Sequence, residues 1–285
     1  MDIAFLSIVL AVAMILMLAV GVWVSLTLVG VGILGLLLSG NDQIGLLFAT
    51  SSWGASTSWS LTALPMFIWM GEVLFRTRLS EDLFKGLAPW MGGLPGKLLH
   101  VNILSCGIFA AVSGSSAATA ATIGRMTLPE LKAQGYSDKM AVGTLAGSGT
   151  LGLLIPPSII LIVYGVAAEV SIGRLFIATT KKENLTFSVK IKALRMLLPI
   201  VGLIIFVLGS IYTGFATPTE AAALGVFGAL IIAAATGSLS IQSFKDSLLG
   251  AVKSSCMIGL ILVGAHFLTL AMGFLGIPRE MAAWI

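Results

Sequence analysis

The sequence predicts an all-α polytopic membrane protein, and three observations carry that prediction. Hydrophobic residues make up 58% of the 285 residues and charged residues only 10%, whereas a soluble domain carries roughly 25% charged residues. No Lys or Arg precedes Arg76. Charge-free stretches recur at about the 20 residues that a helix needs to cross a bilayer. We therefore expect a lipid bilayer around the chain and, because it lacks a basic stripe, no nucleic acid as a partner.

The apolar stretches divide the chain into three predicted regions. In the first, 1–178, the predicted elements are spans at 4–20, 24–39 and 61–75, an interfacial stretch at 43–59, a surface helix at 79–90, a hairpin at 97–133 and a broken helix at 138–168. A basic connector follows at 179–195, and the last region, 196–285, holds spans at 196–213, 218–236 and 254–273. The surface helix is predicted because it mixes charge with Leu, Phe and Trp.

Local residue chemistry marks several helix starts. Residues 217–220 read Thr-Pro-Thr-Glu. This order predicts a capping box, in which Thr217 and Glu220 satisfy each other's backbone donors and the proline takes the first helical position. Ser137 and Ser80 each precede an acidic residue at the start of an element, and both are predicted N-caps.

Two apolar stretches contain residues that interrupt a helix. The first, 101–124, is long enough to span but has Ser113-Gly114-Ser115-Ser116 near its centre. The second, 145–164, has three glycines followed by Pro156-Pro157. Each proline lacks a backbone donor, so the pair is predicted to break the helix just before it, near residues 152–156.

Interrupted backbone at membrane depth is tolerated where it faces protein or water. In transporters, unwound carbonyls and helix C-terminal ends coordinate Na⁺, while half-helix N-termini point at anionic substrate groups. Ser and Thr hydroxyls nearby add neutral oxygen ligands. The alternative is close packing, since small residues also let transmembrane helices approach one another. Two such stretches so close together, one with a double proline, favour a binding site.

Four motifs at these places are found together in a known family. They are Gly114-Ser115-Ser116-Ala117, Gly149-Thr150-Leu151-Gly152, Ile155-Pro156-Pro157-Ser158 and Gly214-Phe215-Ala216-Thr217-Pro218-Thr219-Glu220-Ala221. With them the chain resembles the large membrane (permease) subunit of TRAP transporters, the tripartite ATP-independent periplasmic transporters. The resemblance extends from about residue 1 to 285. It implies a first inverted repeat with a re-entrant hairpin and a broken helix, an incomplete second repeat, and movement as an elevator.

The resemblance also implies a function. It implies a multi-pass protein of the bacterial inner membrane that takes part in Na⁺-driven uptake of carboxylates of the C4-dicarboxylate or sialic acid class. The implied partners are a small membrane subunit and a periplasmic binding protein that delivers the substrate. Na⁺ is the coupling ion, and no other cofactor is expected.

The family's functional residues carry over to a hairpin tip that faces an unwound loop. The implied ion and substrate site consists of Ser113, Gly114, Ser115, Ser116, Gly147, Ser148, Gly149, Thr150, Pro156 and Pro157. The implied Na⁺ ligands among them are Ser115, Ser116, Gly149 and Thr150.

The chain departs from the family pattern in two places. A second hairpin and second broken helix, expected after Trp284, are absent, and a span is expected to be missing after Ala178. Lys and Arg collect on the cytoplasmic side of membrane proteins. With 97–133 re-entrant and no span lost, they divide equally between the two sides. One lost span near residue 178 places nearly all of them inside, and a full crossing by 101–124 places most of them inside. From these departures we expect that the chain alone does not transport.

Other functions are weighed against this one. A divalent-anion/Na⁺ symporter-like protein shares the hairpin and broken helix, and a non-transporting membrane scaffold remnant would keep only contacts with a partner. An enzyme is not expected. The sequence has no cluster of His and carboxylates for a metal, and no base accompanies Ser115 or Ser116 on their segment.

Three isolated polar residues are read as structural. Glu72, four residues before Arg76, predicts an ion pair at the end of its span. His266 lacks a carboxylate neighbour and is expected to pack or hydrogen-bond rather than carry protons. Arg125 is expected to anchor the chain at the cytoplasmic surface, just past the second limb of the hairpin.

Overall fold

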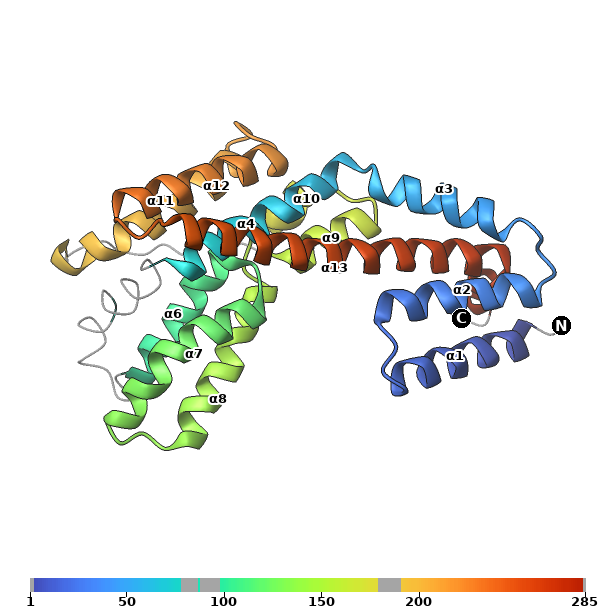
Figure 1. Ribbon diagram of the computed structural model, residues 1–285, viewed down its shortest axis with the longest axis horizontal. Helices are drawn as coiled ribbons and strands as arrows, with labels where there is room; N and C mark the ends of the chain where they lie inside the picture. Colours follow the sequence, from blue (N-terminus) through green and yellow to red (C-terminus); the bar gives the residue numbers. More distant parts are fainter. Residues whose placement is uncertain (1–2, 78–86, 88–97, 179–190, 284–285) are drawn as a thin grey trace. The chain divides into compact units, whose positions relative to one another are not determined.

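The computed structural model describes residues 3–77, 87, 98–178 and 191–283 (Figure 1). Within these ranges all regular structure is helical and no strand occurs, which confirms the all-α prediction. The predicted surface helix at 79–90, its N-cap Ser80 and most of the predicted connector at 179–195 lie outside the described residues. The described helices form two compact units, residues 1–59 with 256–285 and residues 60–255.

The first unit contains a helical hairpin and the C-terminal helices. Its helices are α1 (Ile3–Ala19), α2 (Val24–Leu38), α3 (Ile44–Ser56), the second part of α13 (Ile241–Phe274) and α14 (Ile277–Ala283). The α1–α2 turn contains Gly21 at φ 87°, a left-handed conformation that glycine adopts without strain. Fully buried Phe267 packs edge-on against Phe48 with ring centroids 5.1 Å apart. Gly32 makes room for the Phe267 ring, because a Cβ there would lie 2.8 Å from it.

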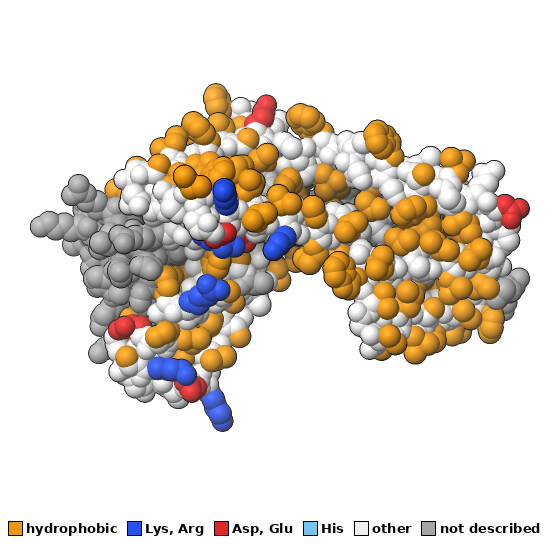
Figure 2. Space-filling model, viewed as in Figure 1, with side chains coloured by type: hydrophobic (Ala, Val, Ile, Leu, Met, Phe, Trp, Pro, Cys, Tyr) orange, Lys and Arg blue, Asp and Glu red, His pale blue; other side chains and the backbone are white. Residues whose placement is uncertain are grey.

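The outer surface of the first unit is apolar. Hydrophobic side chains gather over the visible face of α1 and α2 and are sparser over α3 (Figure 2). Ile8 is 63% exposed and Val20 83% exposed. A soluble protein rarely exposes a contiguous patch of this kind, so this surface suits the hydrocarbon of a bilayer.

The second unit contains the interrupted segments. Its helices are α4 (Ala63–Arg76), α6 (Leu98–Ser113), α7 (Ser116–Ala133), α8 (Asp138–Gly149), α9 (Ile159–Ala167), α10 (Ile172–Ala178), α11 (Ile191–Tyr212), α12 (Pro218–Ala235) and the first part of α13. Short 3₁₀ turns precede α4 (η1, Trp59–Thr62) and follow α8 (η2, Thr150–Leu153). Helices α6, α7 and α8 pack on one another, and α4 packs on α6 and α12 (Figure 1).

Two predicted helix starts are confirmed. Thr217 and Glu220 form the capping box of α12: the Glu220 carboxylate accepts from the Thr217 backbone N–H at 2.8 Å, and the Thr217 hydroxyl accepts from the Glu220 N–H at 3.3 Å. Ser137 caps α8 by accepting from the Met140 N–H at 3.4 Å. Charged side chains gather where α7 passes into α8 (Figure 2), and Lys132 pairs there with Asp138 at 3.1 Å.

Helix α13 begins earlier than the span at 254–273 that hydropathy predicts. It starts at Ile241. The prediction began too late because Gln242, Lys245 and Asp246 in its first turns are compatible with a helix but lower the mean hydropathy. Among the described helices, α12 and α13 are long and apolar enough to cross a membrane, judged by length and composition. Shorter apolar helices lie at Phe5–Ala19, Val24–Leu38, Leu98–Ala111 and Leu198–Tyr212.

Candidate ion and substrate site

The first interrupted stretch folds back on itself at the predicted residues. Helix α6 ends at Ser113, Gly114 adopts φ 59°, and α7 begins at Ser116. The Ser115 hydroxyl caps α7 by accepting from the Ala118 N–H at 3.3 Å. Residues 101–124 therefore form a helical hairpin and not one crossing helix, so the arrangement that treats them as a full crossing is wrong. We call residues 113–116 the tip.

The second interrupted stretch is a broken helix. Helix α8 ends at Gly149, the 3₁₀ turn η2 occupies 150–153, and α9 begins only at Ile159. The Pro156–Pro157 peptide in this gap is cis. Ser158 closes the gap, since its hydroxyl donates to the Leu153 carbonyl at 2.7 Å and accepts from the Leu161 N–H at 3.5 Å. We call residues 149–158 the break.

The tip and the break are in direct backbone contact. The Ile159 N–H donates to the Gly114 carbonyl at 3.1 Å. A Cβ on Gly114 would lie 2.5 Å from the Pro157 carbonyl oxygen, and one on Gly152 would lie 2.8 Å from the Ser115 carbonyl carbon. Neither neighbour is a side chain that can rotate away. Glycine at 114 and 152 therefore allows the two main chains to approach this closely.

Helix α4 packs directly against the tip. A Cβ on Gly71, in the middle of α4, would lie 3.0 Å from the Ser113 Cα. Neither Gly71 nor Ser158 was among the residues predicted for this site. The available signals were a glycine inside an apolar span and a serine directly after a double proline, in the position of an N-cap.

Four helix ends converge where the tip meets the break. Helices α6 and α8 end there, at Ser113 and Gly149, and α7 and α9 begin there, after their caps Ser115 and Ser158. A helix carries about half a negative charge at its C-terminus and half a positive charge at its N-terminus. The site thus offers carbonyl oxygens for a cation and N–H groups for an anion, and no ionisable side chain lies within residues 113–116 or 149–158.

The hydroxyl groups of the predicted site differ in their hydrogen-bond partners. The buried Ser113 hydroxyl pairs with that of Thr119 at 2.8 Å, and the Ser148 hydroxyl donates to the Thr144 carbonyl at 2.6 Å. These two side chains act within the protein. The Thr150 hydroxyl donates to the Gly147 carbonyl at 2.6 Å, so the lone pairs of its oxygen stay available to accept or to coordinate a cation.

Ser116 is different, because its hydroxyl makes no hydrogen bond among the described residues. It is half-buried, and its carbonyl oxygen lies 3.7 Å from the position of a Cβ on Gly149. Two of the predicted Na⁺ ligands therefore lie beside each other, and the role of Ser115, Ser116, Gly149 and Thr150 as ligands stays a prediction.

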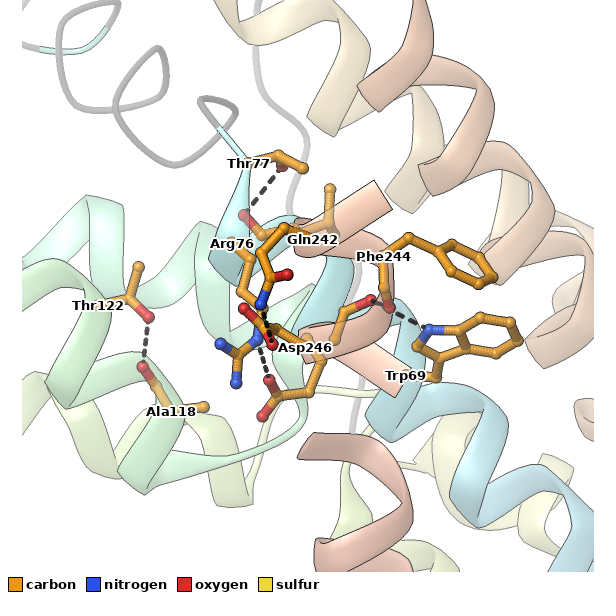
Figure 3. Close-up of polar contacts among 11 residues, drawn as sticks. Trp69, Arg76, Thr77, Ala118, Thr122, Gln242, Phe244 and Asp246 are labelled. Atoms are coloured by element: carbon orange, nitrogen blue, oxygen red, sulfur yellow. Dashed lines mark hydrogen bonds and ion pairs between the residues drawn. The ribbon is translucent and has the colours of Figure 1, made fainter. Parts of the chain in front are cut away.

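The isolated charges of this unit include an ion pair on α4. Arg76 Nε and Glu72 Oε2 are 3.0 Å apart (Figure 3), which confirms the predicted ion pair. The pair packs on α13, since a Cβ on Gly250 would lie 2.6 Å from the Glu72 carboxylate. Trp69 adds a hydrogen bond from its ring N–H to the Ser247 hydroxyl at 3.3 Å (Figure 3).

Arg125 does not lie at the position predicted from the sequence. It is inside α7, not beyond the second limb of the hairpin, because that limb runs on to Ala133. Its guanidinium lies 5.3 Å from the ring centroid of Phe75 on α4. In the other unit, His266 is on an exposed face of α13.

Comparison with known proteins decides the family. The family model of the tripartite ATP-independent periplasmic transporter, DctM component, matches residues 11–182 and 180–285. The chain belongs to this family. It is a family of transporter permeases, so the enzyme and divalent-anion symporter alternatives are set aside.

Curated relatives of the permease agree. The C4-dicarboxylate TRAP transporter large permease protein DctM of Pseudomonas aeruginosa is 30% identical over 89% of this chain and 65% of its own length. The isethionate TRAP transporter permease protein DctMQ of Oleidesulfovibrio alaskensis is 34% identical over 70% of the chain and 36% of its own length. The sialic acid TRAP transporter large permease protein SiaM of Vibrio cholerae is 28% identical over 86% and 63%.

The chain spans less than two thirds of the length of these relatives, and gaps also fall within the alignment. The alignment with the Pseudomonas protein runs over 283 positions but takes in 89% of this chain, which is about 254 of 285 residues. About 29 positions of that alignment therefore have no counterpart in this chain. The two segments matched by the family model meet at 180–182, which supports the expectation of a span missing after Ala178.

Proposed function

We propose that the permease serves a Na⁺-coupled importer of organic anions in the bacterial inner membrane. A small membrane subunit and a periplasmic binding protein that delivers the anion are proposed as its partners. The observation that supports this most directly is the meeting of four helix ends at the tip and the break. Two C-terminal ends suit Na⁺, and two N-terminal ends suit an anionic group.

The proposed substrates are carboxylates of the C4-dicarboxylate or sialic acid class. The names of the Pseudomonas and Vibrio relatives support that class, while the Oleidesulfovibrio relative is named for isethionate, a sulfonate. Carboxylates and sulfonates both present negatively charged oxygens to backbone N–H groups. We therefore propose that the tip and the break recognise the oxyanion group, whatever the rest of the substrate.

Na⁺ binding is the part of this proposal that the chain can be tested for by itself. Purified protein is melted in equal concentrations of NaCl and choline chloride. A ligand that binds only the folded state stabilises it by RT ln(1 + [L]/Kd), which is about 1.4 kcal/mol at ten times Kd. For a chain of this size we expect Na⁺ to raise the melting temperature by roughly 3–5 °C.

Two serine variants sharpen the test. Ser116→Ala removes the unengaged hydroxyl and should reduce the Na⁺-dependent shift. Ser105→Ala is the matched control, because Ser105 is fully buried in α6 and its hydroxyl has no hydrogen-bond partner, so its shift should equal that of the parent. Equal melting temperatures in NaCl and choline chloride for the parent protein would rule out the Na⁺ site.

A further inference from the structure

Asn102 binds two helices at once, at the end of α6 that lies away from the tip. Its side chain is fully buried. Its Nδ2 donates to the Thr144 hydroxyl of α8 at 3.0 Å, and its Oδ1 accepts from the Thr127 hydroxyl of α7 at 3.0 Å. Thr127 is also fully buried. A single amide therefore joins both limbs of the hairpin to the first half of the broken helix.

Between Asn102 and the tip, α7 and its cap pack antiparallel against α8 and η2 along a seam that includes three close glycine contacts. The pairs, with the distance from a Cβ built on the glycine, are Gly124 with Leu145 Cδ2 (2.7 Å), Gly149 with Ala120 Cβ (3.1 Å) and Gly152 with the Ser115 carbonyl carbon (2.8 Å). The residue numbers rise on α8 as they fall on α7. Thr127 and Thr144, joined through Asn102, lie beyond the Gly124–Leu145 pair, at the end of the seam away from the tip.

The seam and the amide constrain α8 differently. Contacts against glycine are close but non-directional, so they resist a small slide of one helix along the other only weakly. A hydrogen bond tolerates little change in length or angle, and a buried polar group that loses its partner is unfavourable. Thr144 lies five residues before Gly149, which is about 7.5 Å along the helix, so a slide at Thr144 moves the break by the same amount.

We infer that Asn102 is a positioning residue that fixes the register of α8 against the hairpin and thereby holds the break against the tip. It does not touch the ion or the substrate. Its effect on Na⁺ binding rests on the function proposed above, whereas its effect on the register does not.

A disulfide measures the register without reference to Na⁺. Cys106 of α6 is buried where α6 packs on α8, and its thiol interacts with the Ser148 side chain of α8, so Ser148→Cys introduces a second thiol near it. After mild oxidation and denaturation, the S148C protein should retain one reactive thiol, that of the exposed Cys256. Thr144→Val in this background removes the α8 arm of the amide and should slow the cross-link about threefold, the scale of one interhelical hydrogen bond.

Further variants make that result specific. Asn102→Leu should slow the cross-link at least as much as Thr144→Val. Ser105→Ala, one turn along α6, should leave the rate unchanged, and Thr127→Val, which cuts only the α7 arm, should change it less than Thr144→Val. If the S148C protein cross-links at the same rate with and without Thr144→Val, the inference is overturned.

The functional arm is a Na⁺ titration of the melting temperature in the native Ser148 background. Thr144→Val should raise the Na⁺ concentration for half-maximal stabilisation about threefold, while Thr127→Val should leave it near the parent value. A changed register with an unchanged Na⁺ midpoint would overturn the positioning role. A changed register in a protein whose parent shows no Na⁺ effect would support Asn102 as the register device and refute the proposed Na⁺ coupling.

Discussion

Replacing Gly152 with alanine tests the contact between the tip and the break most directly. The new Cβ would lie 2.8–2.9 Å from the carbonyl group of Ser115 and the nitrogen of Ser116, whereas non-bonded carbon atoms are comfortable at about 3.5–4.0 Å. The two main chains must therefore separate by more than about half an ångström. Overpacking of this kind costs about 1–3 kcal/mol.

The assay is thermal unfolding of the purified protein in detergent, followed by tryptophan fluorescence. A loss of about 2 kcal/mol should lower the melting temperature by roughly 4–8 °C for a chain of this size, and the Na⁺-dependent shift should shrink because the break moves off the tip. Gly143→Ala is the matched control. Nothing lies within 4 Å of a Cβ on Gly143, so alanine there should be neutral or stabilise α8 by up to about 1 kcal/mol. If Gly152→Ala melts at or above the parent temperature, the close approach of the two main chains is not real.

Three further predictions concern other parts of the chain. Phe267→Ala should destabilise the first unit by about 3–5 kcal/mol, because Phe267 is fully buried; exposed Phe274, changed to alanine, should have little effect, and equal unfolding of the two variants would contradict the packing. Thr217→Ala should cost about 1 kcal/mol in chemical denaturation, with Thr217→Ser restoring most of it; a Thr217→Ala protein as stable as the parent would show that the capping box contributes nothing. Gln134→Cys, in a Cys256→Ser background, should react with an impermeant maleimide in inverted vesicles and not in intact cells, because a re-entrant hairpin keeps its base on the cytoplasmic side; labelling from outside would reject that topology.

The interruptions were predictable because backbone chemistry marks them locally. Gly114 between serines and Pro156-Pro157 inside an apolar stretch leave few helical alternatives. The same holds for the α12 capping box, in which every participant lies within four residues. The start of α13 at Ile241 was missed, since Lys245 and Asp246 hide a helix from a hydropathy criterion without preventing one.

Contacts between residues far apart in the chain could not be predicted from the sequence pattern. Asn102 reads as one polar residue near a helix start, and nothing in the sequence connects it with Thr127 and Thr144 until α7 and α8 are packed on α6. The role of Gly71 was also not predictable, because a glycine that makes room for a neighbouring segment cannot be told from other helical glycines in the sequence alone. The assignment of Na⁺ ligands stays a prediction, since it was carried over from a resemblance and not from contacts.

The absence of ionisable side chains from the tip and the break has an electrical consequence. If this site carries its cargo through the membrane, the full charges within the tip and the break are those of the bound ions and substrate. The membrane potential contributes about 2.3 kcal/mol per elementary charge at 100 mV. Uptake of one Na⁺ with each monovalent anion would then be electrically neutral and independent of the membrane potential. Each additional Na⁺ would make uptake electrogenic. The charge moved per substrate molecule would therefore give the number of coupled ions.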